Sequence, residues 1–311
     1  MKAALLPDRG VVKIAGDGAR NFLHGLVTAD ILNLATGTAR FCALLTPQGK
    51  IIADFIVVEA PAAEGGGFFL DIPRARAATL VERLNVYKLR AKVMIEDLSD
   101  TLGVLAAWDG TCDGTWDGGW NGGGTIKYGL RYADPRLSAL GLRVMVPPHL
   151  AAAGAADLGA VVIAASDYEA HRIALGVPQG GVDFQYGDAF PHESDMDQLG
   201  GVDFAKGCYV GQEVVSRIEH RGIARTRAVP VRFDGAAPQA GVAIMAGERA
   251  VGVMGSATTS PTGGRGLALL RLDRVAEALS HDEPLTGGGV PLHLVKPDWA
   301  RFAFPGEKAA Q

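Results

Sequence analysis

The sequence is poor in cysteine, in net charge and in long apolar runs. Only three cysteines, Cys42, Cys112 and Cys208, are spread over 311 residues, and such an odd, sparse set excludes a disulfide framework and a zinc finger. The formal net charge is -4, so no general basic field exists to bind nucleic acid tightly. No apolar run reaches the ~18 residues of a membrane helix, and the N-terminus lacks the apolar stretch of a secretory signal. These absences predict a cytoplasmic protein without membrane contacts.

What is present is the composition of a folded protein, with 48% hydrophobic and 21% charged residues. The length favours two or three domains with sizeable cores. Helical and strand-like patterns alternate up to about residue 227, and short strands separated by turn residues follow. We therefore expect an α+β region at residues 1–227, an all-β barrel or sandwich at 228–296 and a loose tail at 297–311.

The N-terminal half begins with a predicted strand at 10–15 and a helix over 18–28, with Asp17 as its cap. Pro47-Gln48-Gly49 joins two apolar runs and is typical of a β-hairpin turn. Pro73 is predicted to open a helix that extends to Tyr87. The glycine- and tryptophan-rich segment 109–124 is expected to be a long irregular loop.

The second half carries an ordered loop and a further helix in its pattern. Residues 180–206 are rich in glycine, aspartate and aromatic residues, and residues 211–220 show helical spacing of valine and isoleucine. Arginines 217, 221, 225 and 227 then predict either a basic stripe for an acidic partner or a solvated helix face.

Two short stretches resemble known binding motifs, but each lacks a residue that its motif requires. Gly16-Asp17-Gly18 follows a predicted strand, but Asn21 replaces the third glycine of a dinucleotide loop. His192-Glu193 opens like a zinc protease, but Met196 stands where the second histidine belongs. Neither a dinucleotide site nor a metal site is predicted from these stretches.

Residues 206–213, KGCYVGQE, place a thiol just before a predicted helix. A helix N-terminus and the ammonium of Lys206 are both expected to favour the thiolate form of Cys208. Gly207 and Gly211 permit a tight backbone around the sulfur, and Gln212 and Glu213 stand in the first helical turn. The segment predicts a reactive thiol. A small buried cysteine at a helix start remains the alternative.

The same segment belongs to a longer series of motifs that resembles the YgfZ family, which is related to the glycine cleavage T-protein. The series comprises Phe22–Asp30 (FLHGLVTAD), Leu44–Lys50 (LLTPQGK), Tyr168 with His171-Arg172-Ile173, Gly176-Val177-Pro178, Phe190-Pro191-His192-Glu193, Gly201-Val202-Asp203-Phe204 and Lys206–Glu213 with its Tyr209. The resemblance covers most of residues 9–257, and KGCYVGQE is its most specific element.

The resemblance implies an α+β, T-protein-like folate-binding fold with three lobes around a central funnel and a C-terminal β module. It implies a tetrahydrofolate-binding accessory factor for iron–sulfur cluster assembly or repair. Its partners would be iron–sulfur assembly proteins and radical-SAM client enzymes, including those that modify tRNA. Cys208 would act near the folate pocket.

The resemblance also assigns the folate site. Asp54, Tyr168 and Glu193 would fix the pterin or folate, because a carboxylate can accept from the pterin N–H edge and an aromatic ring can stack on it. Arg9 and Tyr168 stand where some members carry two tryptophans. Arg172, Arg217 or Arg221 would meet the glutamate tail.

Three other functions stay open. The T-protein relationship allows a folate-dependent aminomethyltransferase, although only Asp54 remains of the paired acids and Ala174 replaces a glutamate. A cysteine hydrolase would pair Cys208 with His192 or His220. A scaffold without a ligand is the third alternative.

Overall fold

The computed structural model describes residues 1–62, 65–110, 124–222 and 224–306. The chain divides into two compact units. Unit 1 comprises Met1–Tyr168 and Leu199–Gln212, and unit 2 comprises Glu169–Gln198 and Glu213–Gln311. The predicted segment 109–124 lies largely outside the described residues.

Unit 1 contains a five-stranded antiparallel sheet in the order β3-β4-β5-β2-β6. Its strands are β2 (Arg9–Ala15), β3 (Ala39–Leu45), β4 (Ile51–Glu59), β5 (Phe68–Pro73) and β6 (Met94–Asp97). The predicted hairpin joins β3 to β4, with Thr46 N donating to Lys50 O at 2.8 Å. Gly49 supplies the positive φ of 82° that this turn requires.

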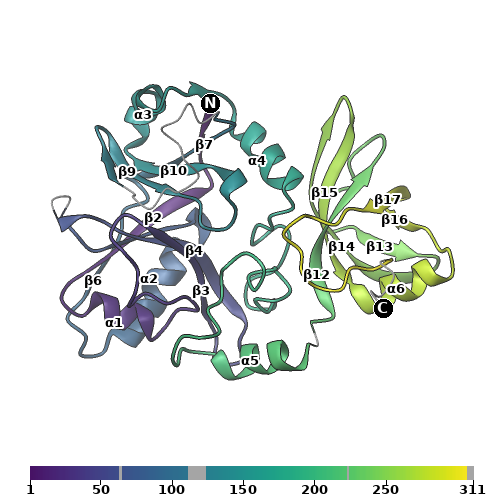
Figure 1. Ribbon diagram of the computed structural model, residues 1–311, viewed down its shortest axis with the longest axis horizontal. Coiled ribbons are helices and arrows are strands. Elements are labelled where there is room, and N and C mark those ends of the chain that lie inside the picture. Colours follow the sequence, from purple (N-terminus) through teal and green to yellow (C-terminus); the bar gives the residue numbers. More distant parts are fainter. Residues whose placement is uncertain (63–64, 111–123, 223, 307–311) are drawn as a thin grey trace. The chain divides into compact units, whose positions relative to one another are not determined.

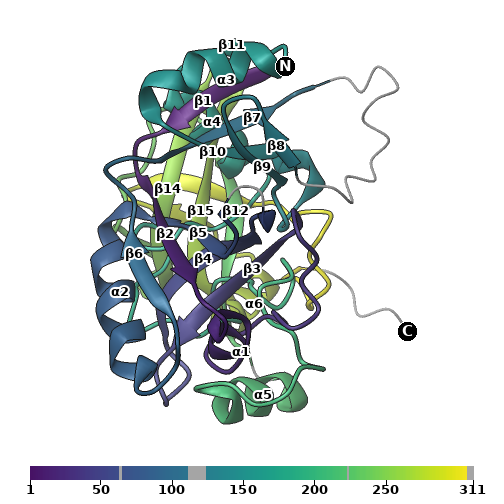
Figure 2. The same ribbon diagram turned by 90° about the vertical axis from the view of Figure 1, so that its left-hand side faces the viewer.

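Two helices accompany this sheet, α1 (Ala19–His24) and α2 (Arg74–Lys88). Helix α2 packs along β2 and β6 and buries Ala77, Leu80 and Leu84 in the core (Figure 2). Pro73 precedes α2 as predicted. Helix α1 is shorter than predicted because the chain turns at Gly25, and Gly18 occupies the N-cap in place of Asp17.

A second, six-stranded sheet of unit 1 has the order β11-β1-β7-β10-β9-β8. Its strands are β1 (Lys2–Leu6), β7 (Gly103–Trp108), β8 (Gly124–Ile126), β9 (Gly129–Ala133), β10 (Leu142–Val146) and β11 (Val161–Val162). Helix α3 (Ala151–Asp157) packs on β7 and β10. Strands β7 and β10 are buried along their whole length; β7 is a continuous apolar run, whereas β10 carries Arg143 among its apolar residues.

Unit 2 is built on a closed six-stranded barrel in the order β12-β15-β14-β13-β16-β17 (Figure 1). Its strands are β12 (Thr226–Phe233), β13 (Ala243–Ala246), β14 (Arg249–Ser260), β15 (Gly263–Arg271), β16 (Leu285–Gly287) and β17 (Val290–Leu294). Helix α5 (Gln212–Arg221) leads toward the barrel, and α4 (Ala165–Ala174) carries the chain from unit 1 into unit 2.

The barrel differs from the predicted all-β module in two places. Helix α6 (Leu272–Ser280) follows β15 directly and buries Val275 and Ala278 against the barrel core. The described part of the expected loose tail, residues 297–306, is anchored, since Phe304 belongs to that core and Ala300 is buried. Within the described residues, no helix has the length and apolar character that crossing a membrane would take.

Candidate functional site

The loop that carries the KGCYVGQE motif is fastened to the segment between α1 and β3. Thr28 is fully buried; its Oγ1 donates to Gly201 O at 2.6 Å and accepts from Ala43 N at 2.9 Å. Asp203 N donates to Thr28 O at 2.9 Å. The Asp203 carboxylate then accepts from Ala205 N and Lys206 N, which forms an Asx turn just before the motif. The FLHGLVTAD stretch is thus the part of the core to which the motif loop is hydrogen-bonded.

Lys206 is the second fastening point. Its ammonium donates to His24 O and to Val27 O, both at 2.6 Å, and lies 5.0 Å from the ring centroid of Tyr209. Burial lowers the pKa of Lys206 to about 8. The side chain that was expected to act on the thiol therefore holds the loop against α1.

Cys208 itself is exposed, whereas Cys42 is buried in β3. Burial raises the pKa of the Cys42 thiol far above its ordinary value, so Cys42 stays neutral and protected. A thiolate can act on a partner only where the partner can reach it. The structure thus removes the alternative of a buried, inert Cys208.

The two motif glycines have different surroundings. A Cβ on Gly211 would lie 2.5 Å from Thr46 O, and its φ is +83°, so this residue packs directly on the β3–β4 turn. A Cβ on Gly207 would have no neighbour within 4 Å among the described atoms. Gln212 and Glu213 begin α5 as predicted, and Glu213 pairs with Arg217 at 2.6 Å.

A pocket of about 550 Å³ opens in unit 1 beside the motif loop. Its lining includes Asp30, Arg40, Phe41, Asp203 and Phe204. The Phe204 side chain stays 41% exposed. An exposed aromatic ring and an exposed thiol therefore stand four residues apart on one anchored loop, an arrangement suited to contact with another protein.

Three of the predicted folate residues gather in unit 1, around a carboxylate that the sequence did not reveal. Arg9 donates from Nε to Asp71 Oδ1 at 2.6 Å and from Nη2 to Asp71 O at 2.7 Å. Asp54, on β4, lies close enough to raise the pKa of Arg9. Although burial opposes its charge, Arg9 and Arg143 lower the pKa of Asp71. Asp71 is therefore a permanent anion in the core.

Arg143 extends this network to Tyr168. It donates to Asp71 Oδ2 at 2.6 Å, to Asp134 Oδ2 at 2.8 Å and to the Tyr168 hydroxyl at 3.0 Å. The Tyr168 ring is buried, in edge contact with Trp108 at 5.2 Å between centroids. Tyr168 is thus placed inside the core, where Arg143 links its hydroxyl to Asp71.

Glu193 and Arg172 lie in unit 2. Glu193 Oε2 accepts from Phe190 N at 2.8 Å and so closes its own turn. Arg172 is buried, and its donors reach Glu169, Val177 O, Asp183 and Ser256. These bonds use all five N–H groups of the guanidinium. Arg227 is likewise buried on Asp195 and Asp197, which removes it from the expected basic stripe.

Sequence reasoning missed Asp71, Arg143 and Asp134, which hold the predicted residues in place. The signal was present but weak: Asp71 and Arg143 are charged residues within otherwise apolar strands. Such residues are rarely buried unless they are paired. Two charges of opposite sign in two apolar strands could have been proposed as partners.

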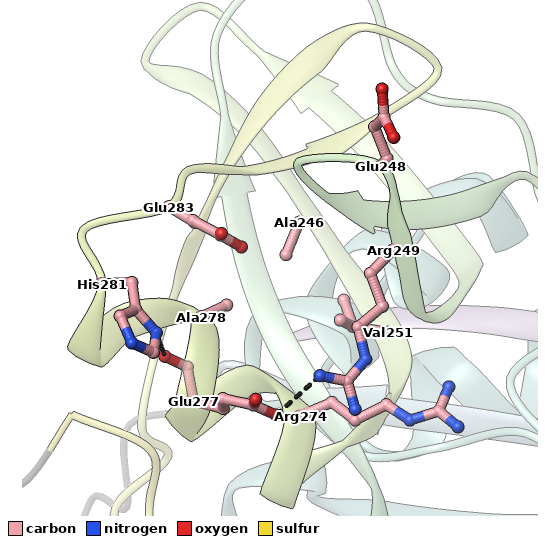
Figure 3. Close-up of a pocket in the computed structure, with 9 residues that line it drawn as sticks. All are labelled: Ala246, Glu248, Arg249, Val251, Arg274, Glu277, Ala278, His281 and Glu283. Atoms are coloured by element: carbon pink, nitrogen blue, oxygen red, sulfur yellow. Dashed lines mark hydrogen bonds and ion pairs between the residues drawn. The ribbon is translucent and has the colours of Figure 1, made fainter.

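A further groove of about 600 Å³ lies on the barrel of unit 2 (Figure 3). Its walls are charged, with Arg249 Nη1 donating to Glu277 Oε2 at 2.6 Å and Arg274 donating to Ala250 O at 3.0 Å. Glu248, His281 and Glu283 complete its rim. None of the residues predicted from the motifs lines this groove.

Comparison with known proteins identifies the family of this chain. A family model described as CAF17, C-terminal beta-barrel domain, matches residues 225–302. The chain is 30% identical to the mitochondrial iron-sulfur cluster assembly factor IBA57 of Mus musculus, over 94% of this chain and 84% of that protein. The chain belongs to the IBA57 family. Identity to the Pyricularia oryzae IBA57 homolog is 33%, over 90% of this chain and 74% of the relative.

Other matches set the extent of this similarity. The chain is 35% identical to the IBA57 homolog of Mycosarcoma maydis, but the match spans only 57% of that relative. The solved structure of glycine cleavage system aminomethyltransferase T from Bartonella henselae matches with a TM-score of 0.73 at 15% identity, over 97% of this chain and 87% of that one. This similarity confirms the predicted α+β, T-protein-like fold with a C-terminal barrel.

Two expectations change with these comparisons. The relatives carry the name IBA57, where the motifs had pointed to YgfZ. The prediction of a cytoplasmic protein is wrong on this comparison, because the IBA57 relatives are described as mitochondrial, which points to the mitochondrion.

Proposed function

We propose that this protein is an accessory factor in iron–sulfur cluster assembly and that Cys208 supplies a thiolate for a cluster or iron ion in transit. The named role of the IBA57 relatives supports the process. The assignment of this role to Cys208 rests on its exposure and on its position in a loop that Thr28, Asp203 and Lys206 fasten to the core. A fixed but open thiol is what cargo transfer requires.

One thiolate is insufficient to hold a cluster, because iron–sulfur clusters generally take four protein ligands. The remaining ligands therefore come from an iron–sulfur assembly protein that docks on the motif loop. Phe204 would supply the apolar contact of that interface and the neighbouring 550 Å³ pocket its recess. The resemblance to YgfZ extends the proposal to radical-SAM clients, including enzymes that modify tRNA.

Tetrahydrofolate is the proposed cofactor. The T-protein-like fold supports it, and so does the buried Asp54 carboxylate, which can accept from the N–H edge of a pterin. The guanidinium of Arg9 would offset the negative charge of Asp54. Tyr168 would act indirectly, because its hydroxyl bonds to Arg143, which bonds to Asp71. Bound folate would supply a one-carbon carrier or a reduced pterin.

A folate-dependent aminomethyltransferase is the second candidate, because its fold covers nearly the whole chain. Purified protein with tetrahydrofolate and an aminomethyl donor separates the two functions. Turnover at a rate comparable with a T-protein would establish the transferase, and folate binding without turnover supports the accessory role.

The test of the thiol is complementation of a strain that lacks the protein, with the activity of an iron–sulfur client and tRNA methylthiolation as readouts. Cys208→Ala should lose both readouts and keep the wild-type melting temperature, because the residue is exposed. Full complementation by Cys208→Ala would remove the thiol from the function.

Folate binding is tested by titration calorimetry with tetrahydrofolate on wild type, Asp54→Asn and Asp100→Asn. Loss of one charged hydrogen bond should weaken binding by about 10- to 100-fold in Asp54→Asn. Asp100, whose side chain is 97% exposed, is the matched control and should bind as wild type does. Equal affinities in all three proteins would place the folate elsewhere.

A further inference from the structure

Unit 2 brings one histidine and two carboxylates together outside the motif loop. His192 Nε2 lies 3.0 Å from Glu219 Oε2. One ligand atom from each of His192, Asp197 and Glu219 falls within 4.8 Å of the others. The side chains of His192 and Asp197 are only 2% and 4% exposed, while Glu219 is 44% exposed. Two of the three groups are thus fixed inside the protein and the third closes the cluster from the surface.

The local fold explains why these residues meet. His192 and Asp197 belong to a run of turns, in which Asp195 N donates to His192 O at 3.2 Å and Met196 N to Pro191 O at 2.9 Å. Asp195 has φ +55°, a left-handed conformation that aspartate tolerates better than most residues. This reversal puts residues five apart on one side of the segment. Glu219 reaches them from the last turn of α5.

Arg227 holds the buried part of the cluster. Its guanidinium donates to Asp197 Oδ1 at 2.8 Å and Oδ2 at 2.9 Å, and to His192 O at 3.0 Å. Gln198 adds a bond to Asp197 Oδ2 at 2.6 Å. Oδ1 accepts only one of these bonds and can still offer a lone pair. Metal-ligating carboxylates are commonly oriented by such outer hydrogen bonds.

The spacing suits a metal ion. Two ligand atoms that each lie about 2.1 Å from one ion, at about 90°, are about 3 Å apart. This is the separation of His192 Nε2 and Glu219 Oε2. Ligand atoms on opposite sides of the ion would be about 4.2 Å apart, and the three ligand atoms here all lie within 4.8 Å of one another. Access comes from a pocket of about 550 Å³ that His192, Glu219 and Arg227 help to line.

The charges also fit a divalent cation. Asp197 and Glu219 offer two negative charges, and the single positive charge of Arg227 offsets only part of them. Imidazole nitrogen suits zinc, copper, iron and nickel, whereas magnesium and calcium prefer all-oxygen sets. We propose that His192, Asp197 and Glu219 bind one divalent first-row transition metal ion in unit 2. The ion would replace the His192–Glu219 contact and tie α5 to the 190–198 segment.

The experiment uses the full chain, stripped of metal and titrated with Co²⁺ and, by competition, with Zn²⁺. Wild type, Glu219→Gln and Glu213→Gln are compared by the visible absorption of bound Co²⁺. Glutamine at 219 can still bond to His192, so this variant should fold, which its melting curve checks. Glu213 is on the same helix, with its side chain 83% exposed, and is the control.

Wild type should bind one equivalent of Co²⁺, which Zn²⁺ displaces and excess Mg²⁺ does not. Glu219→Gln should weaken that binding by about 10- to 100-fold, and Glu213→Gln should leave it unchanged. A wild type without a Co²⁺ spectrum at millimolar metal overturns the proposal, and so does a folded Glu219→Gln protein with wild-type affinity. In either case the cluster is an ordinary histidine–glutamate pair.

Discussion

Unit 1 buries cations in two places, and it treats them differently. In the core, Arg9 and Arg143 lie against the Asp71 carboxylate at 2.6 Å each. In the motif loop, the Lys206 ammonium donates to two neutral carbonyls. In the first region the cations bond directly to a carboxylate, whereas in the second the ammonium bonds to neutral carbonyls.

The difference sets which charges are permanent. The arginines lower the pKa of Asp71 despite its burial, so the core network keeps its ions over a wide pH range. Burial lowers the pKa of Lys206 to about 8, so the motif loop holds a group that can lose its proton under mild conditions. The core network is built for stability, and the loop beside Cys208 is built from weaker and adjustable bonds.

The largest effect should come from breaking the core network. Asp71→Ala leaves two buried arginines without their shared anion and should lower the free energy of unfolding by about 3–5 kcal/mol. The matched surface change, Asp100→Asn, removes a pairing with Arg74 that is mostly exposed and should cost less than about 1 kcal/mol. Denaturant titration measures both.

If Asp71→Ala does not fold, Asp71→Asn answers the same question, because the amide keeps the shape and removes the charge. A loss below about 1 kcal/mol in a folded Asp71 variant would show that the arginines find other partners. The comparison between a locked core and an adjustable loop would then fail.

The next effect tests how the motif loop is seated. Gly211→Ala would put a methyl group 2.5 Å from Thr46 O at a positive φ, so it should lower the free energy of unfolding by about 1–3 kcal/mol. Gly207→Ala meets open space and should change it by less than about 0.5 kcal/mol. Equal melting temperatures for the two variants would contradict a loop packed on the β3–β4 turn.

Most of the strands and helices could be predicted because hydrophobic periodicity and turn residues are local signals. The β3–β4 hairpin, α2 and α5 follow from Pro47-Gln48-Gly49, Pro73 and the valines after Gly211. Helix α6 was missed because Leu272 continues the apolar run of β15, and only packing on the barrel separates the two.

The motif of the candidate site could be predicted from the sequence, but the contacts of its side chains could not. KGCYVGQE marked Cys208, yet no local pattern shows that the Lys206 ammonium donates to His24 O and Val27 O. Arg172 carries the charge expected of an anion ligand, but all its donors bind inside unit 2. Partners more than 70 residues away, such as Asp71 for Arg143, arise only from sheet topology.

The last effect is a pH dependence of stability that Lys206 should confer. Its pKa is about 8 in the folded protein and near 10.5 when the chain is unfolded. Between these values the unfolded chain keeps a proton that the folded protein has lost, so stability from this group rises as the pH rises and falls as the pH returns through 8. The neutral amine still has two N–H groups for His24 O and Val27 O, so the loop keeps both bonds.

Lys206→Met lacks this titration. The stability of wild type relative to this variant should therefore increase between about pH 8 and about pH 10, as measured by denaturant midpoints. Parallel curves would mean that Lys206 stays charged, and that the motif loop is locked as firmly as the core.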